Sequence, residues 1–493
     1  MNSTASNSAH AGKVFQVGSL TYTKAALFSL FTWLLWGDFC LILVQAAVPS
    51  VLQVNVNALG APNWVLGLIL STIPGILNMT IGPVSSFWSD RFRSRWGRRI
   101  PFLFLATIPL AFFLALLGFA PQIGAWLHGA IHGGFSQTAV ILTVVCLLVF
   151  CFQIFNMVVN SVYYYLFNDV VPTEVLSRFM ALFRVVGTLA GAVFNWFFLK
   201  YAASHMAAVF LIAAGLYCTA FLLMCWKVKE GEYPTPPAHA DGGTGLVSSV
   251  KTFFVESYSI RFYWLFFLTN AFYNLMYVTG GFLILQARSI GVDLEFFGKT
   301  YAVAGVLGAV LMYPSGILAD RLHPLRVLLW ASIALLVIQP LWLLFLFYDF
   351  SPAVARGLFV GITVIVTAAT ALYQAAELPM YMRILPKSRY GQFCSANAIV
   401  RSLAMMVGGL VVGLLLDRLA VIYPTKDYCY RFIPVWSVLC AAASLLSLRR
   451  LYSEWQKRGG AAAYQPPGFV PTEEELNTSN QSQVEPLKPG ATA

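Results

Sequence analysis

The chain has 493 residues, of which 59% are hydrophobic and only 10% are charged, and its mean hydropathy is +0.73. Soluble proteins carry about 25% charged residues, so the composition excludes an ordinary soluble domain and predicts a chain that lies mostly in a lipid bilayer. The formal net charge of +11 comes from basic residues in short, separate turns. Because these residues form no continuous basic stripe, we expect no nucleic-acid partner.

Apolar runs long enough to cross a hydrocarbon layer of about 30 Å recur about twelve times along the chain. They predict an all-α membrane protein with about twelve transmembrane helices in two pseudo-symmetric six-helix bundles. The expected spans are 25–48, 64–88, 101–120, 138–168, 181–200, 206–226, 262–287, 298–319, 326–347, 354–382, 391–417 and 431–450.

The polar stretches around these spans divide the chain into five parts. Residues 1–24 form a polar N-terminal segment, and residues 25–226 and 262–450 form the two bundles. The linker between them, 227–261, contains prolines and glycines and has no apolar period, which predicts a flexible connection. Residues 451–493 lose the hydrophobicity of the spans and predict a disordered tail.

The basic residues also predict the orientation of the protein. When the spans are counted in order, most lysines and arginines fall on the side that holds the N-terminus. The positive-inside rule then places both termini in the cytoplasm. We therefore expect a multi-pass protein of the cytoplasmic (inner) membrane.

No catalytic grouping stands out in the sequence. We find no phosphate-binding loop, no His-Glu-x-x-His pair and no Gly-x-Ser-x-Gly turn, and the eight cysteines form no metal-ligand spacing. We therefore expect no enzyme, no catalytic residue, no metal and no cofactor. Without a phosphate-binding loop, transport would depend on an ion gradient or on the gradient of the substrate.

Two charged turns separate pairs of spans at corresponding places in the two halves. The first is Ser89–Arg99, with five arginines and one aspartate, and the second is Gly316–Arg326. Each contains an Asp-Arg pair, Asp90-Arg91 in the first turn and Asp320-Arg321 in the second. Recurrence of such a turn between apolar segments indicates a duplicated membrane protein.

The same residues carry a family resemblance. Gly316–Arg321 resembles the loop signature of the major facilitator superfamily. Asp90-Arg91 followed by Gly97–Phe102 is similar to one branch, the sucrose carriers and the glycoside–pentoside–hexuronide cation symporters. The resemblance covers roughly residues 21–450. It implies a rocker-type carrier whose substrate, a neutral sugar or glycoside, binds between the two halves.

Asp38 is the carboxylate that the span limits place near the middle of the membrane. It follows Lys24 by 14 residues, which is roughly 21 Å along a helix. A carboxyl group in that position could take up and release a proton on each transport cycle. The competing hypothesis is a structural hydrogen bond to a neighbouring helix.

Other charged residues in or beside the spans suggest a gate on the cytoplasmic side. The resemblance implies that Arg401 pairs with Asp90, and Arg184 with Asp320, when the carrier is closed on that side, although Arg401 could instead contact substrate hydroxyls. The expected gate comprises Asp90, Arg91, Arg184, Asp320, Arg321, Glu377 and Arg401.

Two spans carry amides and tyrosines at helical spacing, which suits a neutral polyol because amides pair with hydroxyls and rings cover the apolar sugar face. For any one of these residues, contact between helices is the favoured role, but two such stripes in different halves favour a shared cavity. The expected substrate-binding residues are Gln153, Asn156, Asn160, Asn270, Tyr273, Asn274 and Tyr277.

The chain departs from the sugar-carrier patterns at the coupling positions. Gln153 stands where the sucrose carriers have an acidic residue, and Asn78 and Thr80 lie in the span where melibiose-type carriers have paired aspartates. Proton coupling must therefore fall to Asp38, or the protein is a uniporter.

We predict a monomeric secondary transporter that moves a neutral sugar or glycoside, with a proton, by alternating access. Three other functions stay open at this point: an exporter of hydrophobic compounds, a nutrient sensor with a carrier fold, and a membrane-embedded enzyme. The amides of the two polar spans argue against the exporter, and the short tail argues against the sensor.

Overall fold

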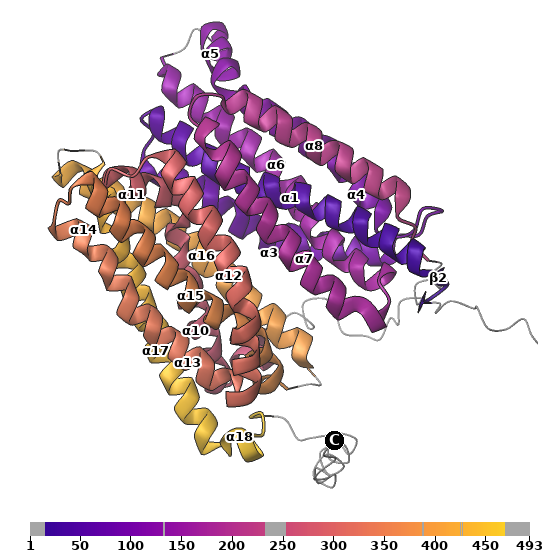
Figure 1. Ribbon diagram of the computed structural model, residues 1–493. Coiled ribbons are helices and arrows are strands. Elements are labelled where there is room, and N and C mark those ends of the chain that lie inside the picture. Colours follow the sequence, from indigo (N-terminus) through magenta and orange to yellow (C-terminus); the bar gives the residue numbers. More distant parts are fainter. Residues whose placement is uncertain are drawn as a thin grey trace, which may run out of the picture.

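The computed structural model describes residues 15–131, 134–231, 253–386, 389–423, 425 and 427–468. Within these residues, 11 helices are long and apolar enough to cross a membrane. They are grouped in two bundles that lie side by side (Figure 1). This is the all-α, two-bundle membrane fold that the sequence predicts.

The first bundle contains the helices before residue 228. Its elements are β1 (Phe15–Val17), β2 (Leu20–Tyr22), α1 (Lys24–Ala58), α2 (Asn63–Gly67), the π-helix η1 (Leu68–Thr72), α3 (Ile73–Arg91), α4 (Ile100–Gly118), α5 (Ala120–Ile131), α6 (Gln137–Val170), α7 (Thr173–Val193), the π-helix η2 (Phe194–Phe198), the 3₁₀ turn η3 (Leu199–Tyr201) and α8 (Met206–Lys227).

The second bundle contains the helices after residue 260. Its elements are α10 (Arg261–Tyr277), the 3₁₀ turn η4 (Val278–Phe282), α11 (Leu283–Ser289), α12 (Leu294–Leu322), α13 (Pro324–Ile338), the 3₁₀ turn η5 (Gln339–Leu343), α14 (Leu344–Phe347), α15 (Pro352–Ile384), α16 (Tyr390–Ile422), the 3₁₀ turn η7 (Tyr428–Phe432), α17 (Ile433–Lys457) and α18 (Gly460–Ala463).

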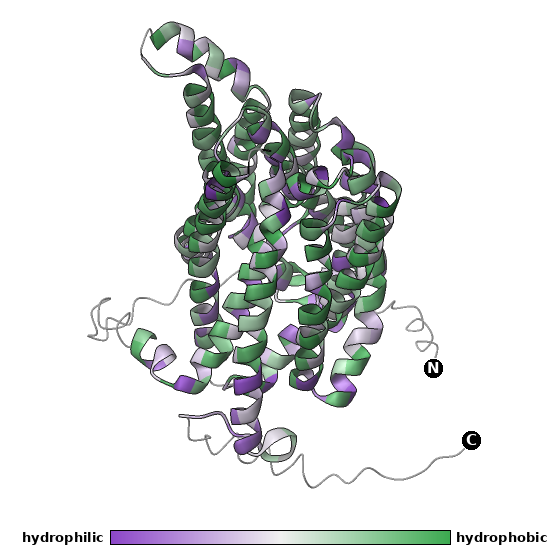
Figure 2. Ribbon diagram, turned by 90° about the vertical axis from the view of Figure 1, so that its left-hand side faces the viewer, coloured by the Kyte–Doolittle hydropathy of each residue, from purple (hydrophilic) through white to green (hydrophobic). Residues whose placement is uncertain are grey.

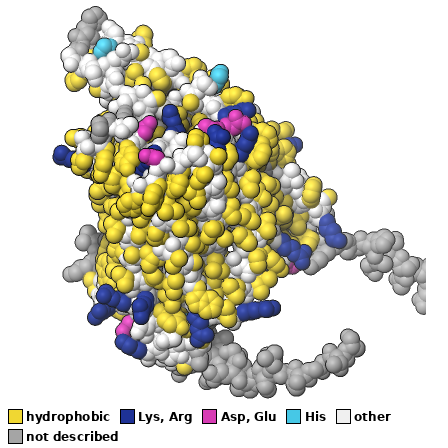
Figure 3. All heavy atoms as spheres, turned by 60° about the vertical axis from the view of Figure 1, so that its left-hand side comes forward, with side chains coloured by type: hydrophobic (Ala, Val, Ile, Leu, Met, Phe, Trp, Pro, Cys, Tyr) yellow, Lys and Arg dark blue, Asp and Glu magenta, His cyan; other side chains and the backbone are white. Residues whose placement is uncertain are grey.

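Hydrophobic residues fill the middle of the long helices, and hydrophilic residues gather toward their ends (Figure 2). The molecular surface repeats this pattern, with a wide hydrophobic band between two zones of charged side chains (Figure 3). We call the end that carries β2 and α18 the terminus face, and the other end the opposite face. The apolar band lies where hydrocarbon would surround the protein.

The seventh expected span, 262–287, is broken in two. The regular helix α10 ends at Tyr277, and η4 follows with Gly280 and Gly281 before α11 begins. Gln53 of α1 satisfies backbone groups at the break, because its amide donates to the Gly280 carbonyl at 3.2 Å and its oxygen accepts from the Ile284 N–H at 3.3 Å. The span is therefore two helices joined by a turn.

The structure differs from the predicted segment limits at both ends of the chain. Residues 15–22 form an antiparallel hairpin within the expected N-terminal segment. The last long helix, α17, continues to Lys457 because Leu451 and Trp455 are buried in the second bundle. The described chain then runs to Gly468, and the rest of the expected tail, like most of the linker, lies outside the described residues.

The two bundles pack tightly near the opposite face. Helix α16 lies against α2, η1 and α3, and α12 lies against α7 and η2. A Cβ added to Gly67 would lie 2.0 Å from the backbone oxygen of Gly409, and one added to Gly413 would lie 2.5 Å from the Cα atom of Trp64. Only glycine permits such an approach of two helix backbones.

Hydrogen bonds reinforce this closure. The Asp417 carboxylate accepts from the backbone N–H groups of Asn63, at 2.7 Å, and Trp64, at 3.0 Å, at the start of α2. The Tyr430 hydroxyl accepts from the Asn57 amide and donates to Asn63 Oδ1, both at 2.7 Å. Toward the terminus face the ribbons of the two bundles diverge (Figure 1).

Candidate functional site

A cavity of about 410 Å³ lies inside the second bundle. Its walls come from α10, α11, α12, α15 and α17 and from the turns η4 and η5, while the first bundle contributes Thr188 of α7. The cavity falls within the size range of small-molecule sites. It is thus built mainly by one bundle, whereas the sequence predicted a site between the two halves.

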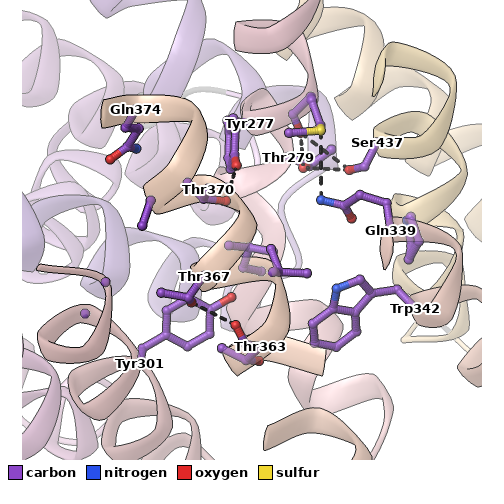
Figure 4. Close-up of a pocket in the computed structure, with 18 of the residues that line it drawn as sticks. Tyr277, Thr279, Tyr301, Gln339, Trp342, Thr363, Thr367, Thr370, Gln374 and Ser437 are labelled. Carbon is purple, nitrogen blue, oxygen red and sulfur yellow. Dashed lines mark hydrogen bonds between the residues drawn. The ribbon is translucent and has the colours of Figure 1, made fainter. Parts of the chain in front are cut away.

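A polar stripe on α15 forms one wall of the cavity (Figure 4). Thr363, Thr367, Thr370 and Gln374 follow one another at intervals of four, three and four residues, which places them on one helix face. The Thr370 hydroxyl lies 2.7 Å from the Tyr277 hydroxyl of α10. The hydroxyls of Thr363 and Thr367 donate to carbonyls one turn earlier, at 2.7 and 2.8 Å, and keep lone pairs for a ligand.

Aromatic and amide side chains complete the walls. Trp342 of η5 and Tyr301 of α12 both line the cavity, and Gln339 lies beside Trp342 (Figure 4). Gln286 of α11 and Ser437 of α17 add two more polar groups. The cavity therefore offers hydroxyls, amides and ring faces, and none of its lining residues is charged.

Of the seven residues predicted to bind substrate, Tyr277 lines this cavity. Asn270 is fully buried and donates to the Phe266 carbonyl at 3.0 Å. Asn274 donates to the Asn270 carbonyl at 2.7 Å, and its oxygen accepts from Arg401 at 3.1 Å. Tyr273 stacks on Tyr373 of α15, with ring centroids 3.6 Å apart. Tyr273 and Asn274 therefore connect α10 to α15 and α16 in this conformation, whereas the bond of Asn270 lies within α10.

The amides of α6 form a hydrogen-bonded chain in the first bundle. The Asn156 amide donates to Gln153 at 2.9 Å, and the Asn160 amide donates to the Asn156 side chain at 3.0 Å. Gln45 of α1 donates to Asn160 Oδ1 at 2.7 Å. The chain joins α1 to α6, and its residues do not line the cavity of the second bundle.

Asp38 is buried between three helices of the first bundle, with 1% of its surface exposed. Neither carboxylate oxygen has a hydrogen-bond partner among the described residues. Gly187 of α7 lies beside it, and a Cβ there would be 3.5 Å from Oδ2. The hydroxyl of Tyr163 donates to the Leu34 carbonyl instead. An ionised carboxyl in such a place costs several kcal/mol, and protonation removes that cost.

The predicted gate residues bind within their own bundles here. Asp90 forms ion pairs with Arg98, at 4.0 Å, and with Arg99. Arg401 lies 3.9 Å from Glu377 as well as beside Asn274. The structure therefore does not bring Asp90 and Arg401 together, since the bundles diverge on that side.

The second predicted pair is likewise not formed. Arg184 and Asp320 are exposed, and neither has an ion-pair partner in the part of the chain that the structure describes. Arg321 is also exposed at the end of α12, and Arg91 ends α3. Both pairs stay predictions for a state that is closed at the terminus face.

Most residues of the cavity wall were not predicted from the sequence. The signal that could have found it is the Thr363–Gln374 stripe, which has the same three- and four-residue spacing as the polar residues of α10. Threonine is common inside transmembrane helices, where its hydroxyl donates to the preceding turn, so a threonine stripe indicates a binding wall less clearly than asparagines do. The residues of η5 could not be found by periodicity, because a 3₁₀ turn interrupts the helix there.

Comparison with known proteins identifies the family. A family model described as MFS/sugar transport protein matches residues 36–428. The chain belongs to this family. Members of the MFS/sugar transport family are membrane transporters and not enzymes, so this chain is a multi-pass transport protein. The major facilitator resemblance seen in the two charged turns is confirmed.

Among curated relatives of this MFS protein is the sucrose transport protein SUT4 of Oryza sativa subsp. indica, which is 28% identical over 210 residues. The match covers 39% of this chain and 35% of the rice protein, so it spans about a third of that relative's length.

Solved structures show the same fold at low sequence identity. A D-xylose–proton symporter has a TM-score of 0.57 at 14% identity, over 85% of this chain and 96% of the symporter. A bacterial homologue of the iron transporter ferroportin has a TM-score of 0.64 in its inward-facing state, at 15% identity over 86% of this chain and 99% of its own. The outward-facing state of that homologue has a TM-score of 0.53 at 15% identity, over 86% and 99% of the two chains.

Proposed function

We propose that this transporter carries a neutral sugar or glycoside, as a monomer, and that the cavity of the second bundle binds it. The observation that carries the proposal is the pairing of an uncharged polar stripe on α15 with the rings of Tyr277, Tyr301 and Trp342. Hydroxyls and amides pair with sugar hydroxyls, and rings cover the apolar faces of a sugar. The family match and the sucrose transporter among its relatives support the same substrate class.

The substrate proposal can be tested by ligand-induced stabilisation. The purified protein is screened by thermal shift against mono- and disaccharides, since a bound ligand stabilises by RT ln(1 + [L]/Kd). We expect Thr370→Val to bind the sugar that stabilises the wild-type protein about tenfold more weakly, because the substitution removes one hydroxyl from the cavity wall. Thr219→Val is the matched control, since that hydroxyl donates to Gly215 within α8 and lies outside the cavity.

If Thr370→Val and Thr219→Val bind this sugar equally well, the cavity is not its binding site. A response to hydrophobic compounds and to no sugar would favour the exporter. The cavity has an extensive apolar wall, with Met276, Leu283, Met312 and Val366 among its lining residues, so this alternative is worth including in the screen.

We further propose that the terminus face is cytoplasmic and that the structure is the inward-facing state. The tight glycine contacts close the opposite face, and the better match to the inward-facing ferroportin homologue supports this state. In intact cells, a cysteine at Ser94 should be shielded from an impermeant thiol reagent, while one at Gln122 of α5 should react. Labelling at Ser94 and protection at Gln122 would reverse the orientation.

We propose that Asp38 couples transport to a proton. Its burial without a partner supports a cycle in which the carboxyl is protonated in this state and becomes ionised when the bundles move. Asp38→Asn keeps the size and removes the titration. The variant should fail to accumulate sugar against a gradient yet retain counterflow exchange.

One observation favours the alternative, a uniporter. Asp38 lies in the first bundle and is not among the residues that line the cavity of the second. If the wild-type protein never accumulates sugar against its gradient, the protein is a uniporter and Asp38 has a structural role. If Asp38→Asn still accumulates sugar with proton uptake, coupling occurs elsewhere.

A further inference from the structure

A second, basic pocket lies at the terminus face, between the start of α10 and the end of α17. Its volume is about 340 Å³. Four basic side chains and one carboxylate line it, together with Phe262, Leu265 and Ser453. The charged residues are Arg261, Arg450, Glu454, Lys457 and Arg458.

The charges in this pocket do not balance. Glu454 forms an ion pair with Lys457 at 2.9 Å. Arg458 lies over the Phe262 ring, 5.5 Å from its centroid. Within the described chain, Arg261 and Arg450 have no ion-pair partner. An excess of positive charge around a hollow of this size indicates an anionic ligand.

The position of the pocket along α17 points to the membrane surface. Leu439 is 63% exposed and Leu446 61% exposed, and both lie on the outward side of α17. One turn beyond Leu446, or roughly 6 Å along the helix, the same side of α17 carries Arg450 and then Lys457. This side of the helix therefore changes from hydrocarbon-compatible to basic within one turn, as expected where headgroups begin.

We propose that this pocket binds the phosphate headgroup of an anionic phospholipid, with an acyl chain lying along Leu446 and Leu439. Basic pockets between transmembrane helices are sites for such headgroups. A free phosphate ion shares the headgroup chemistry, but it would gain nothing from the exposed apolar side of α17 that leads into the pocket. The exposed leucines thus favour the lipid.

A different occupant would be the chain's own acidic stretch, Glu473–Glu475. The described chain ends at Gly468, and a Cβ on Gly468 would lie 2.3 Å from Ile260, the residue before Arg261. The acidic stretch begins five residues later. The acidic stretch complements the charge of the pocket but not the apolar side of α17. Its binding in the pocket is therefore one of the outcomes that the experiment distinguishes.

The experiment uses the full-length protein in an uncharged detergent. Mixed micelles containing phosphatidylglycerol should raise the unfolding temperature in a concentration-dependent way, and phosphatidylcholine or inorganic phosphate should not. The double variant Arg450→Gln/Lys457→Gln should bind phosphatidylglycerol roughly thirtyfold more weakly. Arg95→Gln, which removes an exposed charge from the same face, should bind as tightly as the wild type.

Three results would overturn the proposal. Equal stabilisation by inorganic phosphate would make the pocket a site for small anions. Unchanged lipid binding in Arg450→Gln/Lys457→Gln would place the lipid elsewhere. Finally, if phosphatidylglycerol stabilises the protein only when the chain is ended at Gly468, the pocket of the complete chain is taken by the acidic stretch. Native mass spectrometry of the purified protein measures retained lipid independently.

Discussion

The two charged turns occupy corresponding corners of the two bundles, yet the neighbouring helix places a side chain of opposite charge beside each of them. In the first bundle, Asp169 stands three residues before Pro172, and in the second bundle Arg383 stands three residues before Pro386. One corner therefore has a carboxylate at this position and the other a guanidinium. We call them the N corner, residues 89–100 with Asp169 and Glu230, and the C corner, residues 320–326 with Arg383 and Trp455.

In the N corner, arginines surround a buried carboxylate. Asp169 is 9% exposed at its side chain and accepts from Arg98 Nε at 2.9 Å and Arg99 Nε at 3.2 Å. Arg99 also reaches Asp90 and Ser89. The guanidinium groups of Arg98 and Arg99 therefore both have carboxylate partners, and α3, α4 and α6 are joined in one network.

In the C corner, a neutral ring replaces the network. His323 adopts a left-handed φ of 74°, and its Nδ1 accepts from the Leu325 N–H at 3.3 Å, which caps α13. The ring packs on Trp455 at a centroid distance of 4.5 Å. Burial, and then the nearby Arg383 and Arg326, lower the pKa of His323 to about 4. The two turns thus differ in length as well as in their interactions, since residues 92–99 separate α3 from α4 whereas His323 alone separates α12 from α13.

The largest expected effect comes from removing the carboxylate of the N corner. Asp169→Asn removes the buried carboxylate that Arg98 and Arg99 share and leaves only the half-exposed Asp90 as their counterion, which should lower the free energy of unfolding by about 3 kcal/mol. The matched change in the C corner, Arg383→Gln, breaks no ion pair in the described structure and should change stability by about 0.5 kcal/mol or less. Thermal unfolding in detergent, followed by tryptophan fluorescence, measures both. Equal losses in the two variants would contradict the comparison.

A smaller effect is expected at the beginning of α4. The Glu230 carboxylate accepts from the backbone N–H groups of Arg98, Arg99 and Ile100, at 2.9, 2.8 and 2.6 Å. A negative charge at a helix N-terminus stabilises by about 1 kcal/mol, so Glu230→Gln should lose about that much in the same unfolding assay. The control is Glu295→Gln, which breaks an exposed pair with Lys299 and should cost only a few tenths of a kcal/mol.

If Glu230→Gln costs no more than Glu295→Gln, the carboxylate is not an effective cap. The N corner would then depend on Asp169 alone.

The effect that is smallest at neutral pH is a change in pH dependence at the C corner. Because the folded pKa of His323 is about 4 and the ordinary value is 6.5, the unfolded chain binds more protons between these two pH values. Stability from this group is therefore complete above pH 6.5 and declines as the pH falls toward 4. His323→Asn, which retains an acceptor and tolerates a positive φ, should flatten that part of the stability curve. An unchanged slope would mean that another group titrates there.

The fold could be predicted because its signals are local. Apolar runs of membrane length and repeated Asp-Arg turns need no knowledge of tertiary contacts, and the family and the two bundles follow from them. The break at η4 was missed, since a glycine pair inside an apolar run does not by itself show where hydrogen bonding changes. Helix α5 was missed because it is short and lies in a connection between two spans.

The site was harder to predict because polar residues in membrane helices serve two purposes. Asn270 and Asn160 have the same spacing and chemistry as a binding wall, but their hydrogen bonds are made to the chain itself. Tyr277 and Thr370 face the cavity only because α10 and α15 are rotated toward each other, which no single helix reveals. The burial of Asp38 was predictable from its depth, whereas the lack of hydrogen-bond partners for its carboxylate depends on how the neighbouring helices pack around it.

The interruption of the seventh span has a practical consequence for measuring motion. Because η4 divides the span and Gln53 binds at the division, α10 and α11 are two separate helices and not one continuous helix. Probe distances measured from α10 alone would not report a movement that is confined to α11. Pairs of spectroscopic labels should therefore be placed on both sides of Gly280.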